Sequence, residues 1–190
     1  NKKSIHTFLK YEKFSYLATL PFYIHSINSI NLLKSKFNFF GLKLIAILVD
    51  FYFNLFSSKI SKNEKIIFIS KIDKNVLDLF NKFSKKHKIH LKRNFQFLNW
   101  RYNRFQNSPY KIIALKKENK LMALVIIKID KIFGCNGVIV MDFAYTELYY
   151  FKKVLLNIKT LKISNFKNVS FILLSALTIE INKFGKIGFL

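Results

Sequence analysis

One stretch of the chain combines the residue types that bind anions and stack on rings. The segment Arg93–Tyr110, RNFQFLNWRYNRFQNSPY, holds the only Trp of the chain (Trp100) and all three of its Arg residues (Arg93, Arg101 and Arg104). A guanidinium group offers a planar fork of donors and stacks on aromatic faces, which an ammonium group does far less well. The stretch therefore predicts either a nucleic-acid surface or a core Trp on an amphipathic helix with solvated Arg beside it.

Other residues that could take part in catalysis or bind a metal do not form a recognisable site. His87 and His90 lie three positions apart, but no Cys or carboxylate accompanies them at a ligand spacing, so no metal site is predicted and a solvated helix end is expected. No Ser/His/Asp arrangement, Cys/His pair or phosphate-binding glycine loop appears, and no catalytic residue is identified. Cys135 is the only Cys, so the chain forms no internal disulfide, which fits a reducing compartment.

The charge balance is strongly basic. The chain carries 33 Lys+Arg against 10 Asp+Glu, a formal net charge of +23, which is typical of proteins that bind nucleic acid or anionic membranes. However, the Lys residues are spread along the chain, and Lys, Asn, Ile and Phe are all enriched together, as under an AT-rich coding bias. Nucleic-acid binding is therefore disfavoured. The first residues have no apolar core of a secretory leader, so a cytoplasmic protein is expected, with contact at the inner face of the membrane left open.

Regular elements are expected on both sides of the Arg-rich stretch. Before it, Ile66–Ser70 has the pattern of a short buried strand, and Asp73 suits the N-cap of a helix. That helix has the inward residues Val76, Leu79, Phe80 and Phe83. Within the stretch, Phe95, Leu98 and Tyr102 have helical spacing, and Pro109 ends the helix.

After Pro109 the pattern alternates between strands and helices. Lys111–Leu115 and Leu121–Lys128 form a predicted hairpin with Glu118-Asn119 at its turn, and Gly134–Gly137 forms a second turn. The remaining expected elements are a strand at Val138–Phe143, a helix at Glu147–Leu156, a strand at Val169–Leu174, a helix at Ile179–Phe184 and a last strand from Gly188. The order from residue 65 is β, α, α, β, β, β, α, β, α, β.

The most apolar segment is Asn38–Phe56. Lys36, Lys43, Ile47, Asp50 and Asn54 form a narrow, mostly polar stripe on it, and Phe40, Leu44, Leu48, Phe51 and Leu55 line the adjacent face. This pattern favours a largely buried helix with one solvent-exposed edge. A membrane span is disfavoured, because a charged Asp at mid-span is costly in lipid. A helix on the membrane surface and a membrane span are the alternatives.

The Arg-rich stretch resembles a family of tandem bacterial proteins with the GNAT (N-acetyltransferase-like) fold. The match rests on Phe97, Leu98, Asn99, Trp100, Arg101, Tyr102, Pro109 and Tyr110, followed by the strand order above. These motif residues are expected to be structural. The resemblance implies a mixed β-sheet flanked by helices, an α/β (α+β) fold, over residues 65–190. It also implies that residues 1–24, with a strand at Phe14–Leu20, are the end of a first such domain, and that residues 25–64 link the two.

The same resemblance implies where a cofactor would bind. Enzymes of this fold hold the pyrophosphate of acetyl-CoA at a loop with the pattern Q/R-x-x-G-x-G/A, through backbone N–H groups and a helix N-terminus. The equivalent residues here are Phe143, Ala144, Tyr145 and Thr146. The segment Asp142–Tyr150 contains no Gly and no basic residue, and Glu147 lies where phosphates would bind. Cofactor binding by this domain is therefore expected to be lost. Tyr145, Tyr149 and Tyr150 are expected to pack rather than to protonate a thiolate.

The resulting prediction is a fragment of an acyl (acetyl) transferase that uses acetyl-CoA. It would act with a missing first domain on a small-molecule acceptor, such as an amine, an amino sugar or a surface-polysaccharide precursor, with no metal. This domain itself would be non-catalytic. The alternative is a basic module without chemistry that associates with an anionic membrane surface or with nucleic acid.

Overall fold

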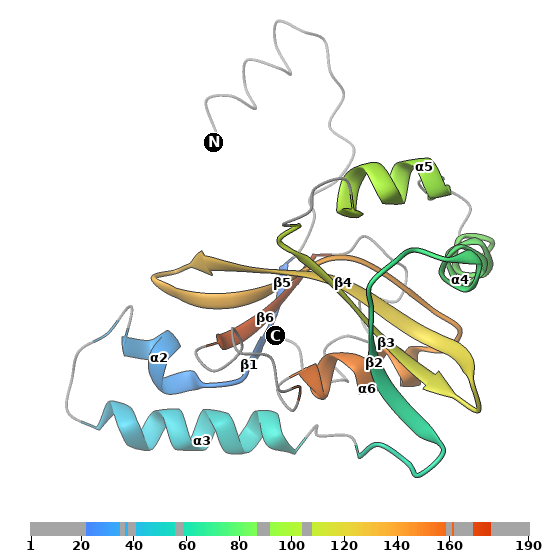
Figure 1. The fold of residues 1–190 in the computed structure, drawn as a ribbon. Helices are drawn as coiled ribbons and strands as arrows, with labels where there is room; N and C mark the ends of the chain where they lie inside the picture. Colours follow the sequence, from blue (N-terminus) through green and yellow to red (C-terminus); the bar gives the residue numbers. More distant parts are fainter. Residues whose placement is uncertain are drawn as a thin grey trace, which may run out of the picture.

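A computed structural model of the chain describes residues 22–34, 37, 41–55, 59–86, 92–103, 108–158, 161 and 169–175 (Figure 1). The elements are β1 (Phe22–Ser26), α2 (Ser29–Lys34), α3 (Leu42–Asn54), β2 (Glu64–Ile69), α4 (Lys74–Ser84), α5 (Phe95–Leu98), the π-helical turn η1 (Asn99–Asn103), β3 (Tyr110–Lys117), β4 (Lys120–Ile132), β5 (Cys135–Tyr145), α6 (Leu148–Leu156) and β6 (Val169–Ser175).

Within these residues the strands form one six-stranded sheet in the order β1-β6-β5-β4-β3-β2. Neighbouring strands are antiparallel except β5 and β6, which are parallel and are joined through α6. Helices α4 and α5 lie on one face of the sheet and α6 lies on the other (Figure 1). The mixed sheet flanked by helices confirms the predicted fold class. Within the described ranges, no helix has the length and apolar character needed to cross a bilayer.

The core lies where the longest strands meet both helix layers. Residues Ile112–Leu115 of β3 and Ala123–Ile127 of β4 are almost fully buried, since these strands are covered on both faces. Asp73 caps α4 by accepting a hydrogen bond from the Val76 amide at 2.9 Å, as the sequence predicted. The four inward residues predicted for that helix are also buried. These are features that a short window of sequence specifies.

Turn chemistry sets the register of the antiparallel strands. The β3–β4 hairpin turns at Glu118 and Asn119, which both have positive φ (49° and 65°), as a two-residue hairpin turn requires. The predicted turn at Gly134–Gly137 is shifted: the chain turns at Phe133 and Gly134, and β5 already begins at Cys135. Gly137 is therefore a strand residue.

Gly137 leaves room for an aromatic ring from the neighbouring strand. A Cβ atom at this position would lie 2.4 Å from the Phe171 ring of β6, and Phe171 is fully buried. We expect Gly137→Ala to lower the free energy of unfolding by about 1–3 kcal/mol, because the ring has to move within a packed core. Chemical denaturation measures this loss. In a Phe171→Leu background the same substitution is expected to cost clearly less; an equal cost in both backgrounds would show that the ring is not the cause.

The N-terminal part of the described chain corrects one expectation. The sequence placed the end of a strand before Phe22, whereas Phe22–Ser26 is itself β1 and pairs with β6. The strand predicted at Phe14–Leu20 lies outside the described residues, as do the helix at Ile179–Phe184 and the strand from Gly188. The division of the chain at residues 24 and 64 stays a prediction.

The apolar face predicted to be buried on helix α3 is exposed. Leu44, Leu48, Phe51 and Leu55, expected to face inward, are each at least 60% exposed. The buried side chains are instead Leu42, Ala46 and Phe53, and the half-buried Asp50 accepts a hydrogen bond from the Ser29 amide at 2.9 Å. The hydrogen bond holds the Asp50 side of α3 against the first turn of α2, whereas Lys43 and Ile47 of the same stripe are exposed. The prediction of a largely buried helix was wrong.

Candidate functional site

The carboxyl end of β5 and the start of α6 correspond to the place where the sequence predicted a cofactor loop. The register between β4 and β5 shifts here, since Ile126 pairs with Asp142 but Ile127 pairs with Val140. Met141 is therefore an extra residue in β5, and such a bulge bends the strand. Among the described residues, pairing of β5 with β6 stops at Val140. Within the described residues, the end of β5 beyond Val140 therefore pairs with β4 only.

The four predicted loop residues lie together, but they are engaged in the fold. Ala144 and Tyr145 are buried within the strand and pair with Leu124 and Ala123 of β4. The Thr146 amide donates to the Met122 carbonyl at 2.8 Å, and its hydroxyl donates to the same oxygen at 3.1 Å. The backbone donor that a phosphate would need at Thr146 is therefore already used.

An aromatic cluster fills the space around this junction. The rings of Phe143 and Tyr145 are stacked at 6.1 Å, and Phe151 of α6 lies 4.8 and 5.1 Å from them. Phe83, near the C-terminal end of α4, reaches the same group, with its ring centroid 4.7 Å from that of Tyr145. Phe83 near the end of α4 and Phe151 in α6 thus both contact the rings at the end of β5.

The end of α4 also brings a cation to the junction. The ammonium group of Lys86, an exposed residue, donates a hydrogen bond to the Thr146 carbonyl and lies 6.0 Å from the centre of the Tyr145 ring. The sequence interpretation missed Lys86, because Lys86 is sixty positions away from Thr146 along the chain. The only signal was its place in the basic run after Lys82. Glu147, the N-cap residue of α6, is exposed and makes no capping hydrogen bond, so a carboxylate remains at this helix N-terminus.

A second group of polar residues lies on the α4 face of the sheet beside the bulge. Arg93 donates from Nε to both carboxylate oxygens of Asp142, at 3.0 and 2.8 Å, and its guanidinium lies 5.6 Å from the centre of the Phe80 ring. Asp142 is buried, and the Tyr102 hydroxyl donates to it at 3.5 Å. Burial, and then the negative charge of Asp142, raise the pKa of Tyr102 above its ordinary value. Tyr102 therefore keeps its proton at neutral pH and acts here as a donor.

The other motif residues divide between the core and the surface. Leu98 is fully buried, and Tyr102 packs edge-on against Tyr110 with ring centroids 5.1 Å apart. Trp100 is 55% exposed, which corrects the alternative of a core Trp. Pro109 and Phe95 are also exposed, so the apolar face predicted for this helix does not include Phe95.

The surface part of the motif is aromatic and cationic. The ring of Phe97 lies 6.2 Å from that of Trp100, and the exposed Arg101 guanidinium lies 6.0 Å from the Phe97 ring and 5.7 Å from that of Tyr102. Arg104 lies outside the described residues. Since Arg93 is bound to Asp142, the three Arg do not present one common exposed face, as a nucleic-acid surface at this stretch would require.

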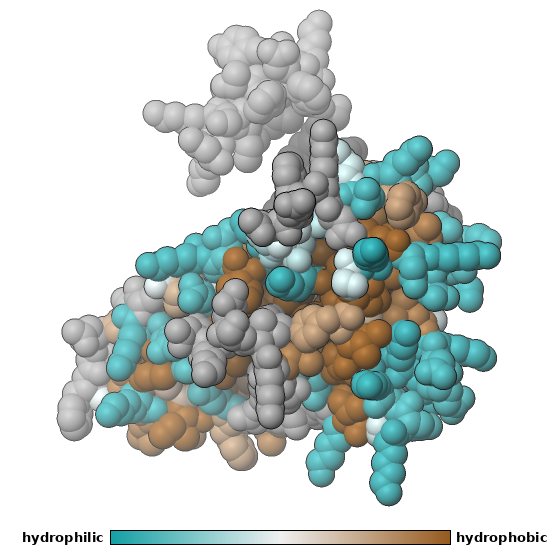
Figure 2. Space-filling model, viewed as in Figure 1, coloured by the Kyte–Doolittle hydropathy of each residue, from teal (hydrophilic) through white to brown (hydrophobic). Residues whose placement is uncertain are grey.

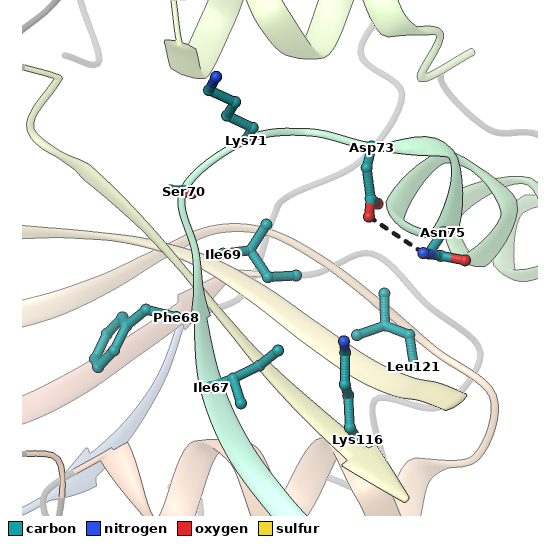
Figure 3. A pocket seen from close by; sticks show the side chains of 9 residues that line it. All are labelled: Ile67, Phe68, Ile69, Ser70, Lys71, Asp73, Asn75, Lys116 and Leu121. Carbon is teal, nitrogen blue, oxygen red and sulfur yellow. Dashed lines mark hydrogen bonds between the residues drawn. The ribbon is translucent and has the colours of Figure 1, made fainter. Parts of the chain in front are cut away.

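A separate hollow of about 310 Å³ lies at the sheet edge, between the end of β2 and the start of α4 (Figure 3). Its lining consists of Ile67, Phe68, Ile69, Ser70, Lys71, Asp73, Asn75, Lys116 and Leu121. The Asp73 carboxylate is already used, by the Val76 amide and by the side chain of Asn75 at 3.2 Å. The hollow therefore offers cationic and apolar groups but no free carboxylate.

Metal-ligating residues give no site in the part of the chain that the structure describes, where no three His, Cys, Asp or Glu side chains come together. His87 and His90 lie outside that part. Cys135 is half-buried, and its thiol donates to the Ile132 carbonyl with an S···O distance of 3.6 Å.

Comparison with known proteins supports the fold. Neither the family models nor the curated proteins include a match to this sequence. Among solved structures, a conserved protein of unknown function from Enterococcus faecalis V583, described as a probable N-acyltransferase, aligns with a TM-score of 0.57 at 11% identity. The alignment covers 96% of this chain and 40% of that protein. A conserved protein of unknown function from Staphylococcus epidermidis ATCC 12228 aligns with a TM-score of 0.51 at 11% identity, over 100% of this chain and 63% of its own.

The chain thus spans less than two thirds of the length of either of these two proteins. At 11% identity the likeness concerns the fold: the six-stranded mixed sheet and its helices match an acyltransferase-like architecture.

Proposed function

We propose that this chain is part of an acyltransferase of the GNAT-like type, and that the domain from β2 onward serves acyl transfer without binding acyl-CoA at its own β5–α6 junction. The acyltransferase assignment is supported by the fold and by the motif from Phe97 to Tyr110. As the resemblance implies, the acyl donor would be acetyl-CoA and the acceptor an amine, an amino sugar or a surface-polysaccharide precursor. The chemistry would then belong to another part of the whole protein.

The observation that carries the non-binding part is the occupied junction. A phosphate at the end of β5 requires free backbone N–H groups and space beside them. Here the Thr146 amide is bound to Met122, and the rings of Phe83 and Tyr145 pack where the chain would have to open. The Glu147 carboxylate adds like-charge repulsion at the helix N-terminus. The cation Lys86 at this point is itself hydrogen-bonded to the Thr146 carbonyl. The residues present therefore do not fit the pyrophosphate of acyl-CoA.

Calorimetric titration of acetyl-CoA tests this proposal. We expect no saturable heat with this chain at cofactor concentrations up to about 1 mM, near the weak end of typical affinities. Two variants make the result specific. Lys86→Ala removes the cation at the junction, and Lys85→Ala removes its exposed neighbour. If the chain binds acetyl-CoA and only Lys86→Ala weakens binding, the junction holds the cofactor and the proposal is wrong on this point.

The acyltransferase assignment itself is tested separately, with the whole protein. We expect release of free CoA from acetyl-CoA in the presence of an amino-sugar or amine acceptor, measured by a thiol assay. Release that does not depend on any acceptor, or no release with a panel of amines and amino sugars, would contradict the assignment.

A further inference from the structure

Helix α3 presents an apolar face that no described part of the chain covers. Its outward side chains are Leu44, Ile45, Ile47, Leu48, Phe51, Tyr52 and Leu55, and each is more than 40% exposed. Figure 2 shows apolar surface gathered at the lower left, where Figure 1 places α3. Scattered exposed apolar residues are ordinary, but a continuous face of seven large ones is typical of an interaction site.

The helix is held in this orientation by its other side. Leu42, Ala46 and Phe53 are buried, Phe53 lies edge-on against His25 of β1 at 4.9 Å, and Asp50 binds the Ser29 amide. The only acidic residue of α3 is therefore turned inward, and the outward surface carries apolar groups together with the exposed Lys43. The exposed face is thus a fixed feature of the packing.

The charge around this helix is of one sign. Residues 22–63 contain five Lys and a single acidic residue, Asp50, and the whole chain has a net charge of +23. Lys34, Lys43, Lys59 and Lys62 are all exposed. A second copy of the chain would bring the same cationic surroundings against this face, and like charges would oppose that association. An anionic surface is favoured by the same charges.

We propose that the outward face of α3 docks this domain on an anionic lipid bilayer. The apolar side chains enter the boundary between headgroups and acyl chains, and the surrounding ammonium groups bind lipid phosphates. The 13 residues of α3 extend only about 20 Å along the helix axis, against about 30 Å for the hydrocarbon core, so the helix lies along the surface. This proposal is independent of acyl transfer and stands or falls without it.

Vesicle flotation with the full chain tests the proposal. Vesicles of phosphatidylcholine alone are compared with vesicles that also contain phosphatidylglycerol, at low and at high salt. We expect the chain to float with the anionic vesicles at low salt, and high salt to weaken the binding, since screening removes the attraction of the Lys residues. Absence of flotation with anionic vesicles, or equal flotation with neutral ones, would overturn the proposal.

Matched variants locate the surface. Leu48→Glu/Phe51→Glu places two charges on the outward face of α3, where both side chains are already exposed, and is expected to weaken binding at least about tenfold. Phe95→Glu introduces a charge at an exposed aromatic residue on α5 and is expected to leave binding unchanged. Circular dichroism verifies that both variants fold. If the α3 variant binds anionic vesicles as strongly as the unmodified chain, this face is not the docking surface.

Sedimentation analysis distinguishes docking on lipid from association with a second copy of the chain. We expect a monomer in the absence of vesicles. If the unmodified chain is a dimer and the Leu48→Glu/Phe51→Glu variant is a monomer, the face pairs two chains and the lipid proposal is wrong.

Discussion

We expect Glu64→Ala to lower the free energy of unfolding by about 3–5 kcal/mol, because it leaves the buried Lys153 ammonium without its counter-charge. Lys153 on α6 is 1% exposed, and its Nζ lies 2.5 Å from Oε2 of Glu64 on β2. The same carboxylate oxygen accepts from the Ser61 amide at 2.9 Å, and the ammonium lies 4.5 Å from the centre of the Tyr149 ring. The pair joins the helix under the sheet to the edge strand.

Chemical denaturation of a small set of variants measures this effect. Replacing both charges, in Glu64→Leu/Lys153→Met, is expected to cost far less than Glu64→Ala, since no charge remains buried. The exposed pair Lys128–Asp130 is the matched control: Asp130→Asn is expected to leave stability nearly unchanged, because solvent screens an exposed pair. A Glu64→Ala loss as small as that of Asp130→Asn would show that the ammonium escapes to solvent.

The pH dependence of stability follows from the same pair. Burial opposes the charged form of Glu64, but the hydrogen bonds from Lys153 and Ser61 outweigh it, so the pKa of Glu64 is lowered in the folded state. That contribution is present above the unfolded pKa and disappears as the pH falls through the folded pKa. Burial likewise opposes the charge on Lys153, and the bond to Glu64 outweighs it, so the pKa of Lys153 is raised. That contribution is complete below the unfolded pKa and is lost as the pH rises through the folded one. The pair is therefore intact between the two transitions, on both sides of neutral pH.

The sequence predicted those features that adjacent residues determine. The Asp73 cap, the inward face of α4, the turn at Glu118-Asn119 and the strand of β6 all depend on local spacing or turn chemistry, and the structure has them. The order of elements from β2 to β6 follows the predicted order as well. Through the family resemblance, this order implied a mixed sheet flanked by helices, which the structure confirms.

Contacts between distant residues were beyond such reasoning. Lys153 follows a helix pattern that gives no sign of burial; only Glu64, eighty-nine positions earlier, explains its inward position. The orientation of α3 depends in the same way on the Asp50–Ser29 bond, and the position of Lys86 beside Thr146 depends on how α4 crosses β5. At the candidate site, the sequence located the junction and the absence of glycine. It did not predict that the Thr146 amide and the aromatic cluster occupy the junction.

The second large effect on stability is expected at Arg93, which connects the segment before α5 to β5 through Asp142. We expect Arg93→Ala to lower the free energy of unfolding by about 3 kcal/mol. The carboxylate of Asp142 is 7% exposed, and among the described residues it would keep the Tyr102 hydroxyl at 3.5 Å and the backbone N–H of Phe143 as donors. Asp142→Asn is expected to cost less, about 1 kcal/mol, since Arg93 is 19% exposed and its charge can be hydrated.

The asymmetry between these two variants distinguishes a structural clamp from a surface ion pair. In a surface pair both single substitutions cost little and nearly the same. In a clamp, loss of the Arg is the costly change, and Arg93→Lys restores only part of the stability, because a compact ammonium replaces the planar guanidinium that also lies beside the Phe80 ring. Denaturation curves of Arg93→Ala, Arg93→Lys and Asp142→Asn, with Arg101→Ala as the exposed control, give the comparison. Near-equal losses for Arg93→Ala and Arg101→Ala would mean that Arg93 does not fix the motif to β5. Arg93 stands just ahead of α5, and its bond to Asp142 ties the segment carrying Tyr102 to the bulged end of β5.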